Sequence, residues 1–183
     1  MSSFLAIDFE TANNAADSAC AVGLVRVEDG KIAREKAFLI CPPSSEFYFT
    51  HIHGLTWEDV AGSPDFGALW PEIETWLEGV DFLAAHNSGF DSRVLKNCCE
   101  RYALNTPQTE FICTVQLARR MWEVRPTRLP NVAHFLGLEL NHHNALSDSR
   151  ACANIVIAAE RDGWSFENGF ANVGERYIAI DQL

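Results

Sequence analysis

The stretch Phe4-Leu5-Ala6-Ile7-Asp8-Phe9-Glu10-Thr11 begins as a buried strand and ends in two acids. Because side chains alternate along a strand, apolar residues occupy both of its faces until the acids arrive, which predicts a central position in a sheet. Asp8 and Glu10 share one face, where two poorly hydrated like charges stay ionised only if cations bind. Oxygen ligands of this kind suit Mg²⁺ or Mn²⁺ better than Zn²⁺. A lone D-x-E motif more often marks two solvated acids, so partners elsewhere are required.

The composition predicts one domain with a proper core. The chain has 183 residues, of which 48% are hydrophobic, including five Trp and 12 Phe. Its first residues do not show the pattern of a signal peptide, and no apolar run is long enough to span a membrane. Both observations favour a cytoplasmic protein with no membrane partner. The six cysteines form no C-x-x-C pair, so buried thiols are favoured over disulfides or zinc ligands.

Hydrophobic periodicity predicts three early strands followed by alternating helices and short strands. An Asp29-Gly30 hairpin joins the second strand to the third, and Thr56 caps a short helix. The expected strands cover residues 4–11, 19–27, 31–40, 82–85 and 111–113, and the expected longer helices cover 66–77, 90–104, 114–122 and 147–160, with a shorter helix around 132–136. This order predicts an α/β fold with a mixed central sheet flanked by helices.

Two of the expected helices carry an acid in their first turn. Asp91 is in helical phase with Val94 and Leu95, and Asp148 is in phase with Cys152 and Ile155, so both acids should face the core. If they merely complemented the helix dipoles, no facing preference would be expected. Together with the strand acids they supply four carboxylates, enough for two metal ions about 3.5–4 Å apart that clamp a phosphodiester.

His143 lies five residues before Asp148, on the loop that leads into the last helix. Its unperturbed pKa of about 6.5, lowered by nearby cations, would leave it neutral and able to accept a proton from water. Without Asp148, the alternative of an ordinary loop histidine beside His142 would be preferred.

These residues resemble the DnaQ-like (DEDDh) 3′–5′ exonucleases, a family with the ribonuclease H-like fold. The similarity covers roughly residues 4–160 and rests on three motifs that occur in the family's order. A His-Ile-His-Gly-Leu-Thr segment is a further point of similarity. The run around 112–120 is most similar to exonuclease X-like members. The motifs are residues 7–11, 85–91 and 143–148, and the added segment is residues 51–56.

The resemblance implies that four acids, Asp8, Glu10, Asp91 and Asp148, hold two Mg²⁺ or Mn²⁺ ions. It also implies that His143 activates the attacking water and that nucleoside 5′-monophosphates are released. The same likeness assigns contacts with the terminal nucleotide to Thr11, His53, Leu55, Asn87 and Phe90. A metal pair of His51 and His53 is the less favoured alternative for that segment.

The net charge of −11 argues against broad adhesion to nucleic acid. One local basic concentration exists, formed by Arg119, Arg120, Arg125 and Arg128. Such a run is usually a solvated face, yet here Arg125 and Arg128 are the best candidates for contacts with backbone phosphates.

The expected substrate is a nucleic acid with a 3′ end. DNA is favoured and RNA stays an alternative, because discrimination depends on contacts to the 2′-hydroxyl. A proofreading subunit held by a polymerase and a homodimer also remain open. Residues 1–163 are expected to form the exonuclease domain. Residues 164–183 are expected to form an extension, in which Tyr177-Ile178-Ala179-Ile180 suggests a strand or a contact with a partner.

Overall fold

The computed structural model describes residues 1–169 of the chain. Its strands are β1 (Phe4–Thr11), β2 (Ala19–Glu28), β3 (Lys31–Leu39), β4 (Phe82–Ala85) and β5 (Phe111–Cys113). Its helices are α1 (Thr50–His53), α2 (Trp57–Val60), α3 (Phe66–Leu77), α4 (Gly89–Arg101), α5 (Thr114–Trp122), α6 (Leu129–Leu136) and α7 (Ala145–Arg161). The α/β class and all five predicted strands are confirmed, with ends that differ by a residue or less.

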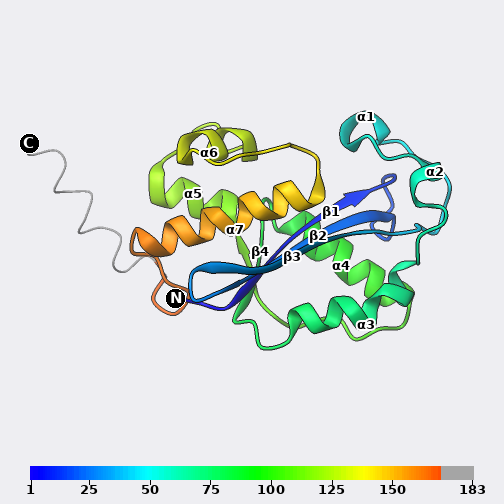
Figure 1. Ribbon diagram of the computed structural model, residues 1–183, viewed down its shortest axis with the longest axis horizontal. Coiled ribbons are helices and arrows are strands. Elements are labelled where there is room, and N and C mark those ends of the chain that lie inside the picture. Colours follow the sequence, from blue (N-terminus) through cyan, green and yellow to red (C-terminus); the bar gives the residue numbers. More distant parts are fainter. Residues whose placement is uncertain (170–183) are drawn as a thin grey trace, which may run out of the picture.

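The strands form one mixed sheet in the order β3-β2-β1-β4-β5. The β1, β2 and β3 strands run antiparallel as a meander, whereas β4 pairs parallel with both β1 and β5. β1 is therefore central, as its apolar faces predict. In Figure 1, α5, α6 and α7 lie on one side of the sheet, and α3 and α4 lie on the other.

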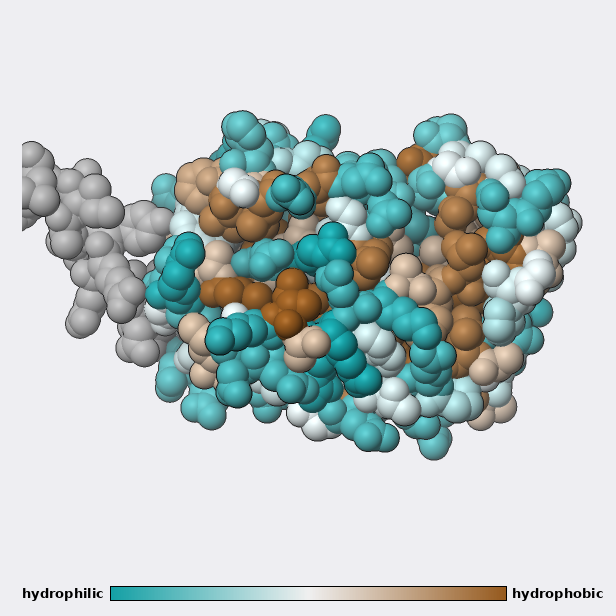
Figure 2. Space-filling view, in the orientation of Figure 1, coloured by the Kyte–Doolittle hydropathy of each residue, from teal (hydrophilic) through white to brown (hydrophobic). Residues whose placement is uncertain are grey.

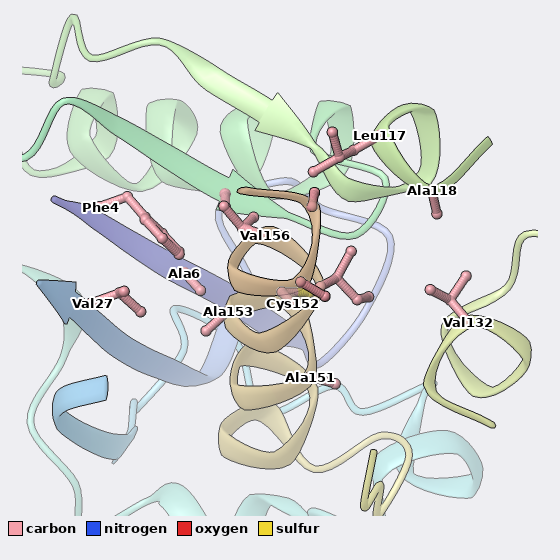
Figure 3. Packing of buried hydrophobic residues seen from close by; sticks show 14 of the residues in the cluster. Phe4, Ala6, Val27, Leu117, Ala118, Val132, Ala151, Cys152, Ala153 and Val156 are labelled. Atoms are coloured by element: carbon pink, nitrogen blue, oxygen red, sulfur yellow. The ribbon is translucent and has the colours of Figure 1, made fainter. Parts of the chain in front are cut away.

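The two faces of β1 belong to two different cores. Phe4 and Ala6 pack in the cluster beneath α5, α6 and α7. Leu5 and Ile7 pack in the cluster formed with α3 and α4. Figure 3 shows Ala153 and Val156 of α7 on the side that faces Phe4 and Ala6. This double coverage makes the end of β1 a rigid place from which to present side chains.

Gly23 of β2 brings α7 unusually close to the sheet. A Cβ atom at this position would collide with the backbone of Ala145, so only glycine fits. Ser149 Oγ donates a hydrogen bond to the Gly23 carbonyl at 2.8 Å. Since Gly23 is the register partner of Asp8, this contact brings the first turn of α7 beside the acidic end of β1.

Local sequence signals predicted where most helices and strands begin and end. Asp29 and Gly30 both have positive φ angles, as a two-residue hairpin turn requires. Thr56 and Asp59 form a reciprocal capping box at the start of α2. Three expected bounds were inaccurate: α4 ends at Arg101 rather than near residue 104, α6 begins at residue 129 rather than 132, and α7 begins at residue 145 rather than 147.

The packing of the core continues beyond residue 163. Trp164 is buried, and its ring meets Phe82 edge-on at 5.9 Å, while the Phe166 ring lies 4.8 Å from the same side chain. The division of the chain at residues 163 and 164 stays a prediction, and the segment 177–180 lies outside the described residues. All six cysteines are free.

The face shown in Figure 2 is mostly hydrophilic, with scattered hydrophobic patches. One of these patches lies toward the end of the molecule that carries α1 and α2. Among residues 1–169, each helix is too short or too polar to cross a membrane.

Candidate active site

The acids of β1 and α7 converge at the carboxyl end of the central strand. One carboxylate oxygen from each of Asp8, Glu10 and Asp148 lies within 4.8 Å of the others. The register of β1 against β2 shifts between Glu10 and Thr11, so the strand is irregular where the acids leave it. In Figure 1, α1 and the first turn of α7 lie on either side of the tip of β1.

Asp91 lies deeper than the other three acids. Its side chain is 1% exposed, and Oδ1 accepts a hydrogen bond from the Phe9 amide at 2.9 Å. This hydrogen bond satisfies the backbone amide of Phe9. That amide lies beyond Ala6, which is the last residue of β1 that pairs with β4. Asp91 thus joins α4 to β1 directly beside Asp8, as its inward phase predicts, and it adds its charge to the floor of the site.

Burial and mutual repulsion disfavour ionisation of these acids. Burial, followed by the charges of Asp91, Asp148 and Glu10, raises the pKa of Asp8 well above its usual value. Burial, followed by the charges of Asp148 and Asp91, raises the pKa of Glu10 to about 8. Burial raises the pKa of Asp91 to about 7. A cation bound among these oxygens would remove the penalty, since it supplies the opposite charge.

Asp148 presents one free oxygen to this site. Its Oδ2 accepts hydrogen bonds from His142 Nδ1 at 2.9 Å and from the His143 amide at 3.0 Å. Its Oδ1 is buried without a hydrogen-bond partner among residues 1–169. A buried oxygen of this kind costs free energy unless something binds it, and a divalent cation fits the all-oxygen donor set. The residues therefore fit the metal that the sequence predicts.

A cavity of about 480 Å³ opens over the acids. Nine of the predicted site residues line it: Asp8, Glu10, Thr11, His53, Asn87, Phe90, Arg128, His143 and Asp148. Three others lie elsewhere among the described residues. Asp91 lies beneath the floor, Leu55 packs in a small cluster with Ala12 and Val60, and Arg125 is outside the lining.

His53 holds α1 against the end of β1. Its Nδ1 accepts the Leu55 amide at 3.1 Å, which leaves the Nε2 hydrogen to be donated to the Thr11 carbonyl at 3.2 Å. Both ring nitrogens are therefore occupied by backbone, which disfavours the metal pair with His51. His51 itself is exposed and contacts the Tyr48 carbonyl.

Several lining residues were not predicted from sequence. Phe9 comes from β1, Phe49 and Ile52 come from the α1 segment, Val115 comes from α5, and the rest are His86, Thr127, Leu129 and His142. Sequence signals existed for some of them, because Ile52 and His86 lie within the segments 51–56 and 85–91 and His142 directly precedes His143. The apolar residues among them belong to elements whose approach depends on tertiary packing.

His86 ties the end of β4 to the loop before α6. Its Nδ1 accepts a hydrogen bond from the Thr114 hydroxyl at 2.9 Å, and its Nε2 donates to the Thr127 carbonyl at 3.1 Å. Thr127 also binds Arg119 through its hydroxyl at 3.0 Å. This network positions the wall of the cavity that carries Arg128.

We expect His86→Gln to destabilise the protein by about 1–3 kcal/mol at pH 7.5, because buried polar partners lose their geometry. Burial lowers the pKa of His86 to about 4, so the unfolded chain binds a proton near pH 6.5 that the folded protein does not bind. Wild-type stability therefore falls as pH falls from about 6.5 toward 4, and the deficit of the variant should shrink there. Urea unfolding at pH 7.5 and pH 5 measures both effects. Exposed His134, replaced by Gln, is the control, and a deficit that is equal at both pH values would contradict the assignment.

The comparisons with known proteins agree with this geometry. Residues 5–156 match the RNase_T family model, described as Exonuclease. The chain is 32% identical over 157 residues to Exodeoxyribonuclease 10 of Escherichia coli K12, covering 80% of this chain and 64% of the relative. It is 31% identical over 159 residues to the PolC-type DNA polymerase III of Thermotoga petrophila, covering 84% of this chain but only 12% of the polymerase.

A solved structure extends the agreement to three dimensions. Exonuclease X, in complex with 5′ overhanging duplex DNA, superposes with a TM-score of 0.73 at 27% identity, covering 93% of this chain and 99% of that one. Its likeness includes the mixed five-stranded sheet with flanking helices. The chain therefore belongs to the DnaQ-like 3′–5′ exonuclease family and has the ribonuclease H-like fold of that family.

Proposed function

We propose that this protein is a metal-dependent exonuclease that removes nucleotides from the 3′ end of DNA and releases nucleoside 5′-monophosphates. The observation that carries the proposal is the convergence of Asp8, Glu10 and Asp148 within 4.8 Å, in a cavity that His143 also lines. The cavity has the size of a small-molecule site, which suits one chain end better than a continuous strand.

Asp8, Glu10, Asp91 and Asp148 would hold two divalent cations, with Mg²⁺ or Mn²⁺ favoured by the oxygen donors. Bound cations of this kind supply a positive field that stabilises the attacking and leaving oxygens of the phosphodiester. Asp8, Glu10 and Asp148 present oxygens to the cavity, while Asp91 acts from beneath, next to the Phe9 amide.

His143 would take the proton from the attacking water. Burial and the neighbouring His142 lower its pKa, which keeps the imidazole neutral and ready to accept a proton. The phenyl rings of Phe49 and Phe90, with Ile52, form an apolar wall for the terminal base and sugar. Arg128 lies in the same lining and would contact a phosphate.

DNA is proposed as the substrate because the Escherichia coli relative is named an exodeoxyribonuclease and the matched exonuclease X structure holds duplex DNA. The match to a PolC-type polymerase supports a second candidate, a proofreading module that is held by a polymerase. We place either activity in the cytoplasm, in an exonuclease domain of residues 1–163.

Labelled substrates test the proposal directly. The protein is incubated with single-stranded DNA, duplex DNA and RNA, each labelled at the 3′ or the 5′ end, in Mg²⁺, Mn²⁺ or EDTA. Stepwise shortening from the 3′ end with mononucleotide products supports it. Internal cleavage products, or activity that survives EDTA, would overturn the mechanism, and a preference for RNA would change the substrate. Co-purification with a DNA polymerase would favour the proofreading role.

We expect Arg128→Gln to weaken binding of single-stranded DNA and to lower the slope of log K against log salt by about 0.7, the value of one phosphate contact. Arg125→Gln should have the smaller effect, because Arg125 does not line the cavity. Lys96→Gln is a matched control, since Lys96 pairs with Glu100 on the exposed face of α4. Binding titrations at several salt concentrations measure the slopes, and an unchanged slope for Arg128→Gln would refute the contact.

A further inference from the structure

His142 and His143 are consecutive residues whose side chains lie together. Along an extended chain, neighbouring side chains point to opposite sides. Here His143 has a φ of 68°, a left-handed conformation that few residues other than glycine adopt. The turn stacks the two imidazole rings with centroids 3.8 Å apart and planes 24° from parallel. The backbone thus presents two nitrogen ligands on the same side of the loop.

Asp148 completes a group of three metal-binding side chains. One potential ligand atom from each of His142, His143 and Asp148 lies within 4.8 Å of the others. His142 Nδ1 and Asp148 Oδ2 are 2.9 Å apart. Bonds of about 2.0–2.1 Å to a tetrahedral ion place its ligands roughly 3.3 Å apart. The two atoms must therefore move apart slightly when an ion binds. Both histidines are exposed, so their rings have room to turn by this small amount.

We propose that His142, His143 and Asp148 form a binding site for a transition-metal cation such as Zn²⁺, separate in its chemistry from the all-oxygen site of Asp8 and Glu10. Two imidazoles and a carboxylate suit Zn²⁺ and disfavour Mg²⁺, which prefers oxygen ligands. Three protein ligands leave a fourth position open to water or to a phosphate oxygen.

Occupancy of this site is incompatible with hydrolysis, an inference that rests on the proposed function. The ion takes the lone pair of His143 that would accept the proton from water. It also binds Asp148 through Oδ2, and so places a positive charge beside the carboxylate whose Oδ1 the all-oxygen site needs. Zn²⁺ therefore acts as an inhibitor of the Mg²⁺-dependent or Mn²⁺-dependent reaction. His142 is the distinguishing residue, because the sequence resemblance assigns no role to it.

Co²⁺ is the spectroscopic probe for binding, used with the full chain in saturating Mg²⁺. Wild type should develop the intense visible bands of a tetrahedral site, without the sulfur charge-transfer bands that a cysteine site would add, and Zn²⁺ should abolish them. His142→Asn should bind Co²⁺ at least about 10-fold more weakly, the lower end of what even an outer-shell change costs. His134→Asn, on the exposed face of α6, should bind like wild type.

The same variants test inhibition, with each rate normalised to its own value without Zn²⁺. The Zn²⁺ concentration that halves hydrolysis should rise at least about 10-fold in His142→Asn and stay unchanged in His134→Asn. Unaltered Co²⁺ bands in His142→Asn would overturn the site, and unaltered inhibition would overturn its effect on activity. A third outcome separates the two proposals. If the wild type hydrolyses none of the substrates, yet shows Co²⁺ bands that the His142→Asn variant lacks, the metal site stands and the proposed function fails.

Discussion

His143→Asn should lower the rate of hydrolysis by about 10²–10⁴, the usual share of a general base, while binding of Mn²⁺ and of substrate changes little. Asparagine is the replacement of choice because His143 has a φ of 68°, a region that Asn tolerates far better than most residues. The backbone amide of residue 143, which donates to Asp148 Oδ2, is therefore kept in place.

Single-turnover rates, with Mn²⁺ and DNA binding measured separately, distinguish the loss of a base from the loss of the site. His143→Ala serves as a second variant, in which any extra loss reports strain of the left-handed backbone. His51→Asn is the control, because His51 is exposed and outside the cavity lining. A His143→Asn enzyme with wild-type kcat would place the base elsewhere.

The protein without metal should lose stability as pH rises from 6.5 to 8.5. Burial raises the pKa of Glu10 to about 8 and that of Asp91 to about 7, so in this range the folded protein binds protons that the unfolded chain has released. Stability contributed by these protons is present at low pH and is lost as pH passes through the folded pKa values. His86 does not contribute here, because its effect is confined to pH below about 6.5.

The expected loss is about 2–3 kcal/mol between pH 6.5 and 8.5, from about 1.4 kcal/mol per pKa unit. This corresponds to a fall in Tm of roughly 5–10 °C for a chain of this size. Mn²⁺ at a hundredfold excess over its Kd should restore about 2.7 kcal/mol. Calorimetric scans in EDTA and in Mn²⁺ at the two pH values measure both effects.

Glu10→Gln is the matched variant for this experiment. It removes the titration of one carboxylate, so the fall in Tm with pH in EDTA should become smaller, and the stabilisation by Mn²⁺ should weaken. Exposed Glu58→Gln on α2 should leave both quantities unchanged. A Tm in EDTA that is the same at pH 6.5 and 8.5 would mean that the acids ionise freely without a cation.

The sequence alone predicted the central strand, because residues that are apolar on both faces must be covered on both sides. It also predicted that Asp91 and Asp148 face inward, because helical phase depends only on spacing along the chain. The hairpin at Asp29 and the cap at Thr56 followed from local turn chemistry in the same way.

Only the tertiary structure decided the shape of the cavity. Phe49 and Leu55 flank the short helix α1, yet Leu55 packs into a small core and Phe49 lines the cavity, a difference that depends on how α1 meets β1. The close contact at Gly23, the hydrogen bond from His86 to the Thr127 carbonyl and the stacking of His142 on His143 all join residues through space or through an unusual φ angle. Periodicity and motifs carry local preferences, so they determined which side chains face the site, whereas long-range packing determined which of them meet there.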